Sequence, residues 1–78
     1  MNQAESWNKV KEALKKTQPQ HAYSTWFEPL FCIGFNDKTL IIEVPNQFFF
    51  EWIQSHYKKI IKSEVDKVYG DETTIKYT

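Results

Sequence analysis

Apolar residues recur at helical spacing in the first segment of the chain. Trp7, Val10 and Leu14 are separated by three and four positions, so they fall on one face of a helix. Asn2 can cap this helix, which we expect to span residues 3–16. The pattern therefore predicts an amphipathic helix at the start of the chain, whose apolar face, Trp7 included, packs into a core.

A second, shorter helix is expected to follow directly. The segment Thr17–Gln20 has the pattern of a capping box, with Pro19 in the first turn, where its missing N–H has no cost. Pro29 ends the helix, because the residue before a proline is disfavoured in the helical region. The apolar face of this helix consists of Tyr23, Trp26, Phe27 and Leu30.

The middle of the chain changes to a strand pattern. Residues 30–35 and 39–44 are rich in β-branched and aromatic side chains, and the turn-forming segment Asn36–Lys38 separates them. These features predict a β-hairpin. Apolar residues alternate in its second strand, so one face of the sheet is expected to be buried and the other mixed.

The last part of the chain predicts one long helix and a final strand. Asn46 can cap the helix, which we expect to continue to about Tyr69, where Gly70 allows a left-handed stop. A strand over residues 73–77 completes the order α-α-β-β-α-β. This order predicts an α+β fold, a three-stranded, mostly antiparallel sheet with helices packed on one face. The buried stripe of the long helix comprises Phe49, Phe50, Ile53, Tyr57, Ile60, Ile61 and Val68.

Two aromatic residues of the long helix do not belong to this stripe. Phe48 and Trp52 are four positions apart and point roughly 100° or more away from it. Either the first two helices cover these rings or the rings stay exposed, and Phe48, at the helix start, is the harder of the two to bury. Beside the polar groups of Asn46 and Gln47, an exposed ring is the kind of anchor that protein interfaces use. We therefore interpret the start of this helix as a candidate partner-binding site.

Composition narrows the class of partner. The chain has 78 residues, a formal net charge of zero and ten basic residues, all of them Lys. A chain of this length builds one small core, which disfavours a large enzyme cleft. Without Arg the bidentate fork that reads guanine and phosphate is missing, and without excess positive charge no field concentrates polyanions or anionic lipids. These features disfavour duplex DNA and membranes and favour a protein partner.

Residues with catalytic or metal-binding potential are few. Cys32 lies in an apolar segment, where we expect a buried structural thiol, and His21 and His56 are too isolated for a zinc site. Gly34 and Gly70 are the two glycines, which excludes phosphate-binding and dinucleotide motifs, and no carboxylate pair stands near a nucleophile. We expect no enzyme activity, no cofactor and no metal. Because no signal peptide, transmembrane segment or disulfide is evident, we expect a cytoplasmic protein.

A series of motifs connects these segments. Trp7 is followed by Trp26-Phe27-Glu28-Pro29-Leu30, then by Val44-Pro45-Asn46-Gln47-Phe48 and Trp52-Ile53. This pattern covers nearly the whole chain and resembles the N-terminal domain, domain I, of the bacterial chromosomal replication initiator DnaA. The resemblance implies a compact KH-like α+β fold, with residues 1–78 forming a single interaction domain. It also implies that the ATPase domain, which would bind ATP, and the DNA-binding domain of the initiator are absent from this chain.

The resemblance further implies partners and the residues that contact them. In that family the domain recruits the replicative DNA helicase to the origin, binds regulators of initiation and supports self-association. Trp7 matches the tryptophan linked to self-association, and Ala22 stands where some members have an acidic residue, which places more of the contact on Phe48. The partner-binding positions, with their neighbours, are His21, Ala22, Tyr23, Asn46, Gln47, Phe48, Phe49 and Trp52.

Two other functions remain open at this point. A KH-like fold with exposed rings could bind single-stranded DNA weakly, because rings stack on bases. However, neither Gly34 nor Gly70 has a second glycine three positions away, so the Gly-x-x-Gly loop that clamps the backbone is missing. The third reading is a homodimerisation domain whose main interface lies at Trp7.

Overall fold

The computed structural model describes residues 3–78, so the expected cap at Asn2 lies outside the described residues. Within this range the helices and strands follow the predicted order, but the second and the third predicted helix are each divided in two. The elements are α1 (Gln3–Thr17), α2 (Gln20–Ala22), the π-helical turn η1 (Tyr23–Phe27), β1 (Phe31–Asn36), β2 (Thr39–Glu43), α3 (Gln47–His56), α4 (Lys58–Tyr69) and β3 (Thr74–Tyr77).

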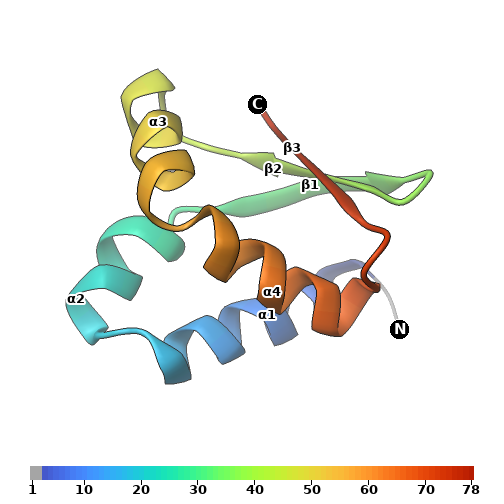
Figure 1. Cartoon of the computed structure of the whole chain (residues 1–78), viewed down its shortest axis with the longest axis horizontal. Helices are drawn as coiled ribbons and strands as arrows, with labels where there is room; N and C mark the ends of the chain where they lie inside the picture. The colour runs from blue at the N-terminus through green and yellow to red at the C-terminus, as the bar shows by residue number, and fades with distance from the viewer. Residues whose placement is uncertain (1–2) are drawn as a thin grey trace.

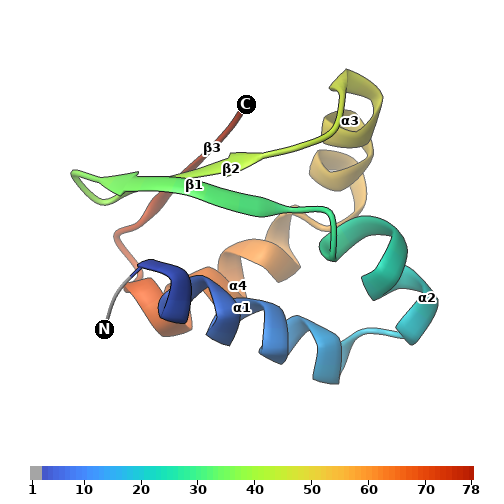
Figure 2. The ribbon, with the colours of Figure 1, turned by 180° about the vertical axis from the view of Figure 1, so that it is seen from behind.

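The sheet and the helices form two layers. Helices α1 and α4 lie side by side under one face of the sheet, and α3 stands at its end (Figures 1 and 2). The strand order is β1-β2-β3, with β1 antiparallel and β3 parallel to β2. The α+β prediction is confirmed, but the sheet is mixed rather than mostly antiparallel. Helices α3 and α4 form a crossover between β2 and β3, so β3 enters the sheet in the same direction as β2.

The hairpin between β1 and β2 is closed by a two-residue turn. Asp37 and Lys38 both have positive φ, 52° and 61°, and Asn36 pairs with Thr39 on either side of them. Positive φ at both central residues is the geometry whose twist matches that of the strands. The ammonium group of Lys38 also pairs with the carboxylate of Glu72, in the turn before β3.

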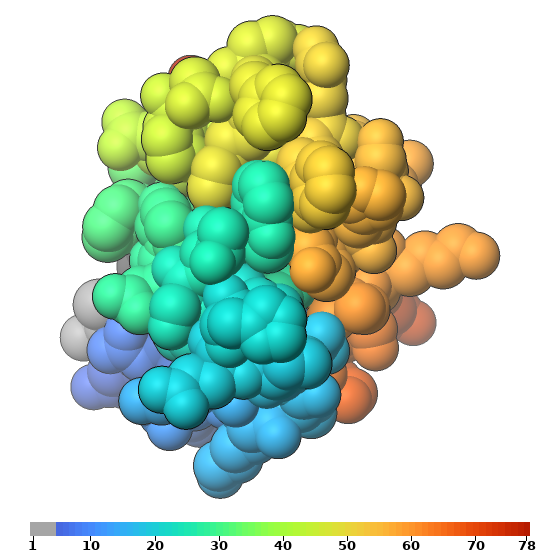
Figure 3. Space-filling model, turned by 90° about the vertical axis from the view of Figure 1, so that its left-hand side faces the viewer, coloured from blue at the N-terminus to red at the C-terminus, as the bar shows by residue number. Residues whose placement is uncertain are grey.

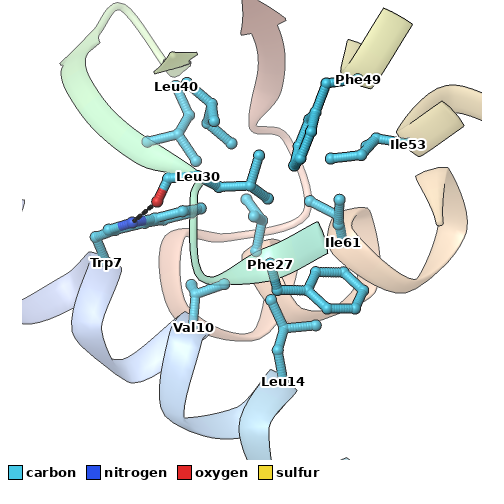
Figure 4. Packing of buried hydrophobic residues seen from close by; sticks show 11 residues of the cluster. Trp7, Val10, Leu14, Phe27, Leu30, Leu40, Phe49, Ile53 and Ile61 are labelled. Carbon is cyan, nitrogen blue, oxygen red and sulfur yellow. Dashed lines mark hydrogen bonds between the residues drawn. The ribbon is translucent and has the colours of Figure 1, made fainter. Parts of the chain in front are cut away.

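The core fills the space between the sheet and helices α1 and α4 (Figure 4). Trp7 is 6% exposed, and its indole Nε1 donates a hydrogen bond to the carbonyl oxygen of Leu30 at 3.3 Å. The expectation that Trp7 belongs to the core is confirmed. Burying each large apolar side chain contributes roughly 1.5–3 kcal/mol. The buried cluster comprises Trp7, Val10, Leu14, Phe27, Leu30, Leu40, Ile42, Phe49, Ile53, Ile61 and Val65.

The long third helix that the sequence predicts is divided in two. Tyr57, between α3 and α4, has φ −125° and ψ 6°, outside the helical region. The amide N–H of Tyr57 still bonds to the carbonyl of Ile53 at 2.8 Å, and that of Ile61 to Tyr57 at 3.0 Å. The hydrogen-bond ladder therefore continues across the break, and the predicted stripe stays on one side, buried or half-buried throughout.

The capping box predicted at Thr17 is wrong. The Thr17 hydroxyl donates to the carbonyl of Ala13 at 3.0 Å, so it closes α1 instead of opening α2. Pro19 occupies the N-cap position of α2, and no side chain caps that helix. The expected second helix is mostly the π-helical turn η1, in which the N–H of Glu28 bonds to the carbonyl of Tyr23 at 2.8 Å.

The start of α3 and the end of α4 lie where the sequence predicts the two ends of the long helix. The side-chain oxygen of Asn46 accepts a hydrogen bond from the amide of Phe49 at 2.8 Å, and Gly70 ends α4 with φ 110°, which confirms both signals. Cys32 is half-buried rather than buried, and its thiol lies 3.6 Å from the carbonyl oxygen of Gly34.

None of the helices among residues 3–78 is long and apolar enough to cross a membrane.

Candidate protein-interaction site

The start of α3 presents an aromatic ring to solvent on a firmly held piece of backbone. Phe48, the second residue of the helix, is 71% exposed. The Asn46 side chain caps the helix, and the amide of Phe50 donates to the carbonyl of Asn46 at 3.1 Å. Because these bonds fix the backbone of the first turn, they set the direction in which the Phe48 side chain leaves the helix. The predicted exposure of Phe48 is confirmed.

Trp52, one turn further along α3, is held from one side by the segment that follows α2. Its ring stacks on Trp26 of η1, with centroids 5.0 Å apart and planes 11° from parallel. Trp26 also contacts Phe49, at 5.1 Å between ring centroids, and His56 packs edge-on against Trp52 at 4.0 Å. Both alternatives for Trp52 thus hold in part, because the second helical segment covers one side of the ring and 38% of the residue stays exposed.

The π-helical turn explains how one short segment can serve both the core and the site. Phe27, at the end of η1, is fully buried and meets the edge of Tyr57 at 4.8 Å. Its neighbour Trp26 is half-buried and lies against α3 instead. A π-helical turn is wider than an α-helical one, and such turns are frequent at functional sites. Trp26 was absent from the candidate residues, because its partners lie more than twenty positions away and no local pattern reveals the contact.

The predicted partner-binding residues divide into exposed and supporting ones. His21, Asn46, Gln47 and Phe48 are exposed, whereas Ala22 and Phe49 are only 7% and 9% exposed. The two buried residues lie beneath this surface and support it. Figure 3 shows α2 and η1, in cyan to turquoise, lying directly next to the yellow side chains of α3. The fold therefore brings the two predicted segments to one face of the molecule.

The chemistry of this face is mainly apolar and neutral. Gln47 donates a hydrogen bond to the carboxylate of Glu51 at 3.2 Å. Burial, followed by the carboxylates of Glu28 and Glu12, raises the pKa of Tyr23 above its usual range, so its phenol stays protonated at neutral pH. A shallow hollow of about 160 Å³ lies on the outer side of α3 and is lined by Phe48, Glu51, Trp52, Ser55 and His56.

No feature of the described part of the chain resembles a metal centre. Residues 3–78 contain no group of three or more His, Cys, Asp or Glu side chains that could hold a metal ion. The two histidines lie on different elements, His21 in α2 and His56 in α3. The arrangement at α3 offers a mainly apolar contact surface with one carboxylate, that of Glu51, at its edge, which suits recognition by packing.

The fold and this surface define a small α+β domain with an exposed aromatic face on its third helix. The chain belongs to the DnaA N-terminal domain family, whose model matches residues 4–67. This family covers the N-terminal domain of a chromosomal replication initiator and not a catalytic ATPase domain.

Individual relatives agree with the family match. The chain is 37% identical over 71 residues to the chromosomal replication initiator protein DnaA of Bacteroides fragilis (strain YCH46), which covers 91% of this chain and 15% of the relative. It is also 37% identical over 71 residues to DnaA of Flavobacterium psychrophilum, with the same coverage of both chains. The identity to DnaA of Chlorobaculum tepidum is 40% over 57 residues, 73% of this chain and 12% of that protein. The chain thus matches about 12–15% of the length of these initiators.

Proposed function

We propose that this domain is a protein-docking module of a replication initiator, and that the replicative DNA helicase and regulators of initiation bind one defined surface of it. The docking face consists of the exposed residues His21, Asn46, Gln47, Phe48 and Trp52 and the half-buried Tyr23, with Ala22 and Phe49 beneath them. The observation that carries this proposal is the 71% exposure of Phe48 on a capped helix start. An exposed aromatic side chain beside polar groups is the kind of residue that anchors protein interfaces.

The charges of the docking face favour a protein over a nucleic acid. No lysine belongs to it, and the carboxylate of Glu51 lies beside Phe48 in the same shallow hollow. A phosphate backbone would be repelled there, since nucleic-acid affinity depends on neutralising cations. Lysines gather elsewhere, on α4, where Lys58, Lys59, Lys62 and Lys67 line an open hollow of about 560 Å³.

A single exposed anchor supports only a modest affinity. One buried aromatic anchor contributes about 2 kcal/mol or somewhat more, and the entropy of association offsets a large part of the total. Several initiators facing one multimeric helicase would bind through many such contacts at once. The effective concentration of the linked sites would then raise the overall affinity well above that of one domain.

Self-association of the initiator is the second part of the proposal. Trp7 is 6% exposed and bonded to Leu30, so its ring is not offered to a second molecule. We infer that Trp7 contributes to self-association by holding α1 and the start of β1 in place. The residues that make the contact must then lie on the surface nearby.

We further infer that the 78 residues act as one domain in the cytoplasm and need no cofactor of their own. A single buried cluster, which includes Trp7, Leu30 and Ile61, joins residues from α1 to α4. ATP binding and duplex DNA binding are proposed to be tasks of other domains of a full-length initiator.

The proposal can be tested by an NMR titration of the labelled domain with the cognate replicative helicase. We expect amide shifts to cluster on residues 21–23 and 46–52. The Phe48→Ala variant should weaken binding about thirtyfold, the effect of losing one anchor of about 2 kcal/mol. Phe31→Ala is the matched control, because it also removes an exposed ring, 57% exposed, from outside the docking face.

A parallel titration with a short single-stranded DNA tests the other class of partner. If only the DNA shifts the spectrum, with lysine-rich segments leading and salt abolishing the effect, the protein-docking proposal fails. Equal losses of helicase binding in Phe48→Ala and Phe31→Ala would also contradict it, because the contact would then not be located at α3.

A further inference from the structure

The face of the sheet that points away from the helices carries an apolar patch. Leu40 and Ile42 of β2 are fully buried on the helix side, so the pleat directs Ile41, between them, to the opposite face. A Cβ atom added to Gly34 would lie 3.6 Å from Cδ1 of Ile41, which places the Ile41 side chain over β1. No element of residues 3–78 covers this side of the sheet (Figure 1).

Strand β1 adds two more apolar side chains to this face. Phe31 pairs with Glu43, which lies two residues from Ile41 and therefore on the same face. Ile33 is the extra residue of a bulge between Cys32 and Gly34. Phe31 is 57% and Ile33 53% exposed, although the ammonium group of Lys11 lies 5.2 Å from the centre of the Phe31 ring. We name Phe31, Ile33 and Ile41 the outer patch.

One charge of each sign borders the outer patch. Glu43 follows Ile41 by two residues along β2, at about 6.6 Å, and Lys76 of β3 pairs with Ile41 across the sheet, at about 4.8 Å. Within residues 3–78 the side chains of Glu43 and Lys76 take part in no ion pair and no side-chain hydrogen bond. The outer patch therefore has an apolar centre, with the Glu43 carboxylate as an acceptor on one side and the Lys76 ammonium group as a donor on another.

We propose that the outer patch is a contact surface for a second copy of this chain, with the two sheets packed face to face. This inference rests on the self-association part of the proposed function and assigns the contact to the sheet. A two-fold axis beside Ile41 brings Glu43 of each copy over Lys76 of the other and joins the apolar centres. The charge pattern is thus complementary to itself, and the zero net charge adds no repulsion between copies.

The size of the face indicates a weak dimer. Three strands of this length present a face of about 14 by 20 Å, or roughly 280 Å². This area is well below the ~800 Å² that each partner buries in a stable complex. Such a contact forms at high local concentration, as when initiators assemble side by side, and dissociates in dilute solution. The docking face at α3 is built from other residues, so one copy can bind a partner and a second copy together.

Sedimentation velocity of the chain over a range from about 10 μM to about 1 mM tests the inference, because self-association makes the average mass depend on concentration. The Ile33→Lys variant places a charge in the apolar centre and should weaken association at least about tenfold. Lys is well tolerated on edge strands, so the monomer should stay folded, with amide shifts confined to the neighbours of residue 33. Phe48→Ala, which removes an exposed ring outside the outer patch, should leave self-association unchanged.

A charge swap tests the pairing itself. Glu43→Lys and Lys76→Glu should each weaken association about threefold, because like charges then face each other, and the double variant should recover to within about twofold of the original chain. A merely structural role of either residue would not produce this rescue.

The failures of the two proposals are distinguishable. If the chain self-associates but Ile33→Lys and the charge variants leave this unchanged, the outer patch is not the interface, while self-association stands. A chain that stays monomeric at about 1 mM overturns both self-association and this inference, and leaves helicase docking at Phe48 untouched. Loss of helicase binding in Ile33→Lys without any effect on mass would assign the patch to another partner and overturn the inference.

Discussion

Trp7 and Phe48 are both large rings near the start of a helix, yet one is 6% and the other 71% exposed. The difference lies in what the helices face. Helix α1 runs under the sheet, so its apolar side meets Leu30 and the strands, whereas α3 stands at the end of the sheet and its first turn has no neighbour on the outer side (Figures 1 and 4). Position in the fold, more than hydrophobicity, thus separates a ring that stabilises from a ring that is free to bind.

The largest effect is expected from Trp7→Ala. Removing a buried indole costs about 3–5 kcal/mol of unfolding free energy, a large part of the ~4–12 kcal/mol that a domain of this size possesses. Urea denaturation followed by circular dichroism measures the loss. Trp7→Phe keeps most of the apolar volume but not the hydrogen bond to Leu30. Its unfolding free energy should therefore lie between those of the original chain and of Trp7→Ala. A loss below about 1 kcal/mol for Trp7→Ala would show that the ring is not structural.

The attachment of α3 to the sheet predicts a loss of stability at high pH. Tyr77 of β3 meets Phe50 of α3 at 5.4 Å, and burial raises the pKa of Tyr77 to about 12. The unfolded chain, with a tyrosine pKa near 10, releases this proton first. The unfolding free energy should therefore be unaffected by Tyr77 below pH 10 and fall between about pH 10 and 12, by up to about 1.4 kcal/mol per unit.

Tyr77→Phe isolates this effect from other groups. Tyr69, whose pKa is raised to about 12 mainly by burial, adds a fall in the same direction. The variant should therefore show a shallower slope, not a flat one, in urea denaturation curves recorded from pH 9 to about 12. Identical slopes in the two proteins would contradict burial of the Tyr77 phenol.

A smaller effect is expected from Asn46→Ala, which removes the cap of α3. The amide of Phe49 loses its 2.8 Å partner, and loss of an N-cap costs about 1 kcal/mol. Asn46→Asp keeps an acceptor oxygen and should retain the stability. If thermal unfolding of Asn46→Ala matched that of the original chain, the capped start of α3 would not be what orders Phe48.

The smallest effect on stability is expected from Phe48→Ala. A ring that is 71% exposed contributes little to the core, so the unfolding free energy should change by less than about 0.5 kcal/mol. Thermal denaturation measures this directly. A loss comparable to that of Trp7→Ala would remove the distinction between the two rings and show that Phe48 belongs to the core.

Local patterns predicted most of the fold and the exposure of Phe48. The spacing of Trp7, Val10 and Leu14 indicated the face of α1, and Asn46 and Gly70 marked the ends of the α3–α4 region. The exposure of Phe48 followed from the same helical geometry, because a side chain off the buried stripe of a capped helix needs a neighbour to be covered.

Features that depend on distant contacts were missed. The break at Tyr57 has no Gly or Pro to announce it, and the apolar spacing continues across it. The π-helical turn that directs Trp26 onto Trp52 depends on packing against α3, and the parallel direction of β3 depends on the crossover. The outer patch was missed because the bulge at Ile33 interrupts the alternation of β1.

The stacked pair of Trp26 and Trp52 also gives the domain its own optical reporter. Trp52 is 38% exposed and therefore emits partly as an indole in contact with water, whereas Trp7 contributes the constant emission of a buried ring. A partner seated on α3 would exclude water from Trp52, shift its emission to shorter wavelengths and alter the transfer of excitation to Trp26, 5.0 Å away. Occupancy of this face can thus be followed by intrinsic fluorescence, with no label attached to either protein.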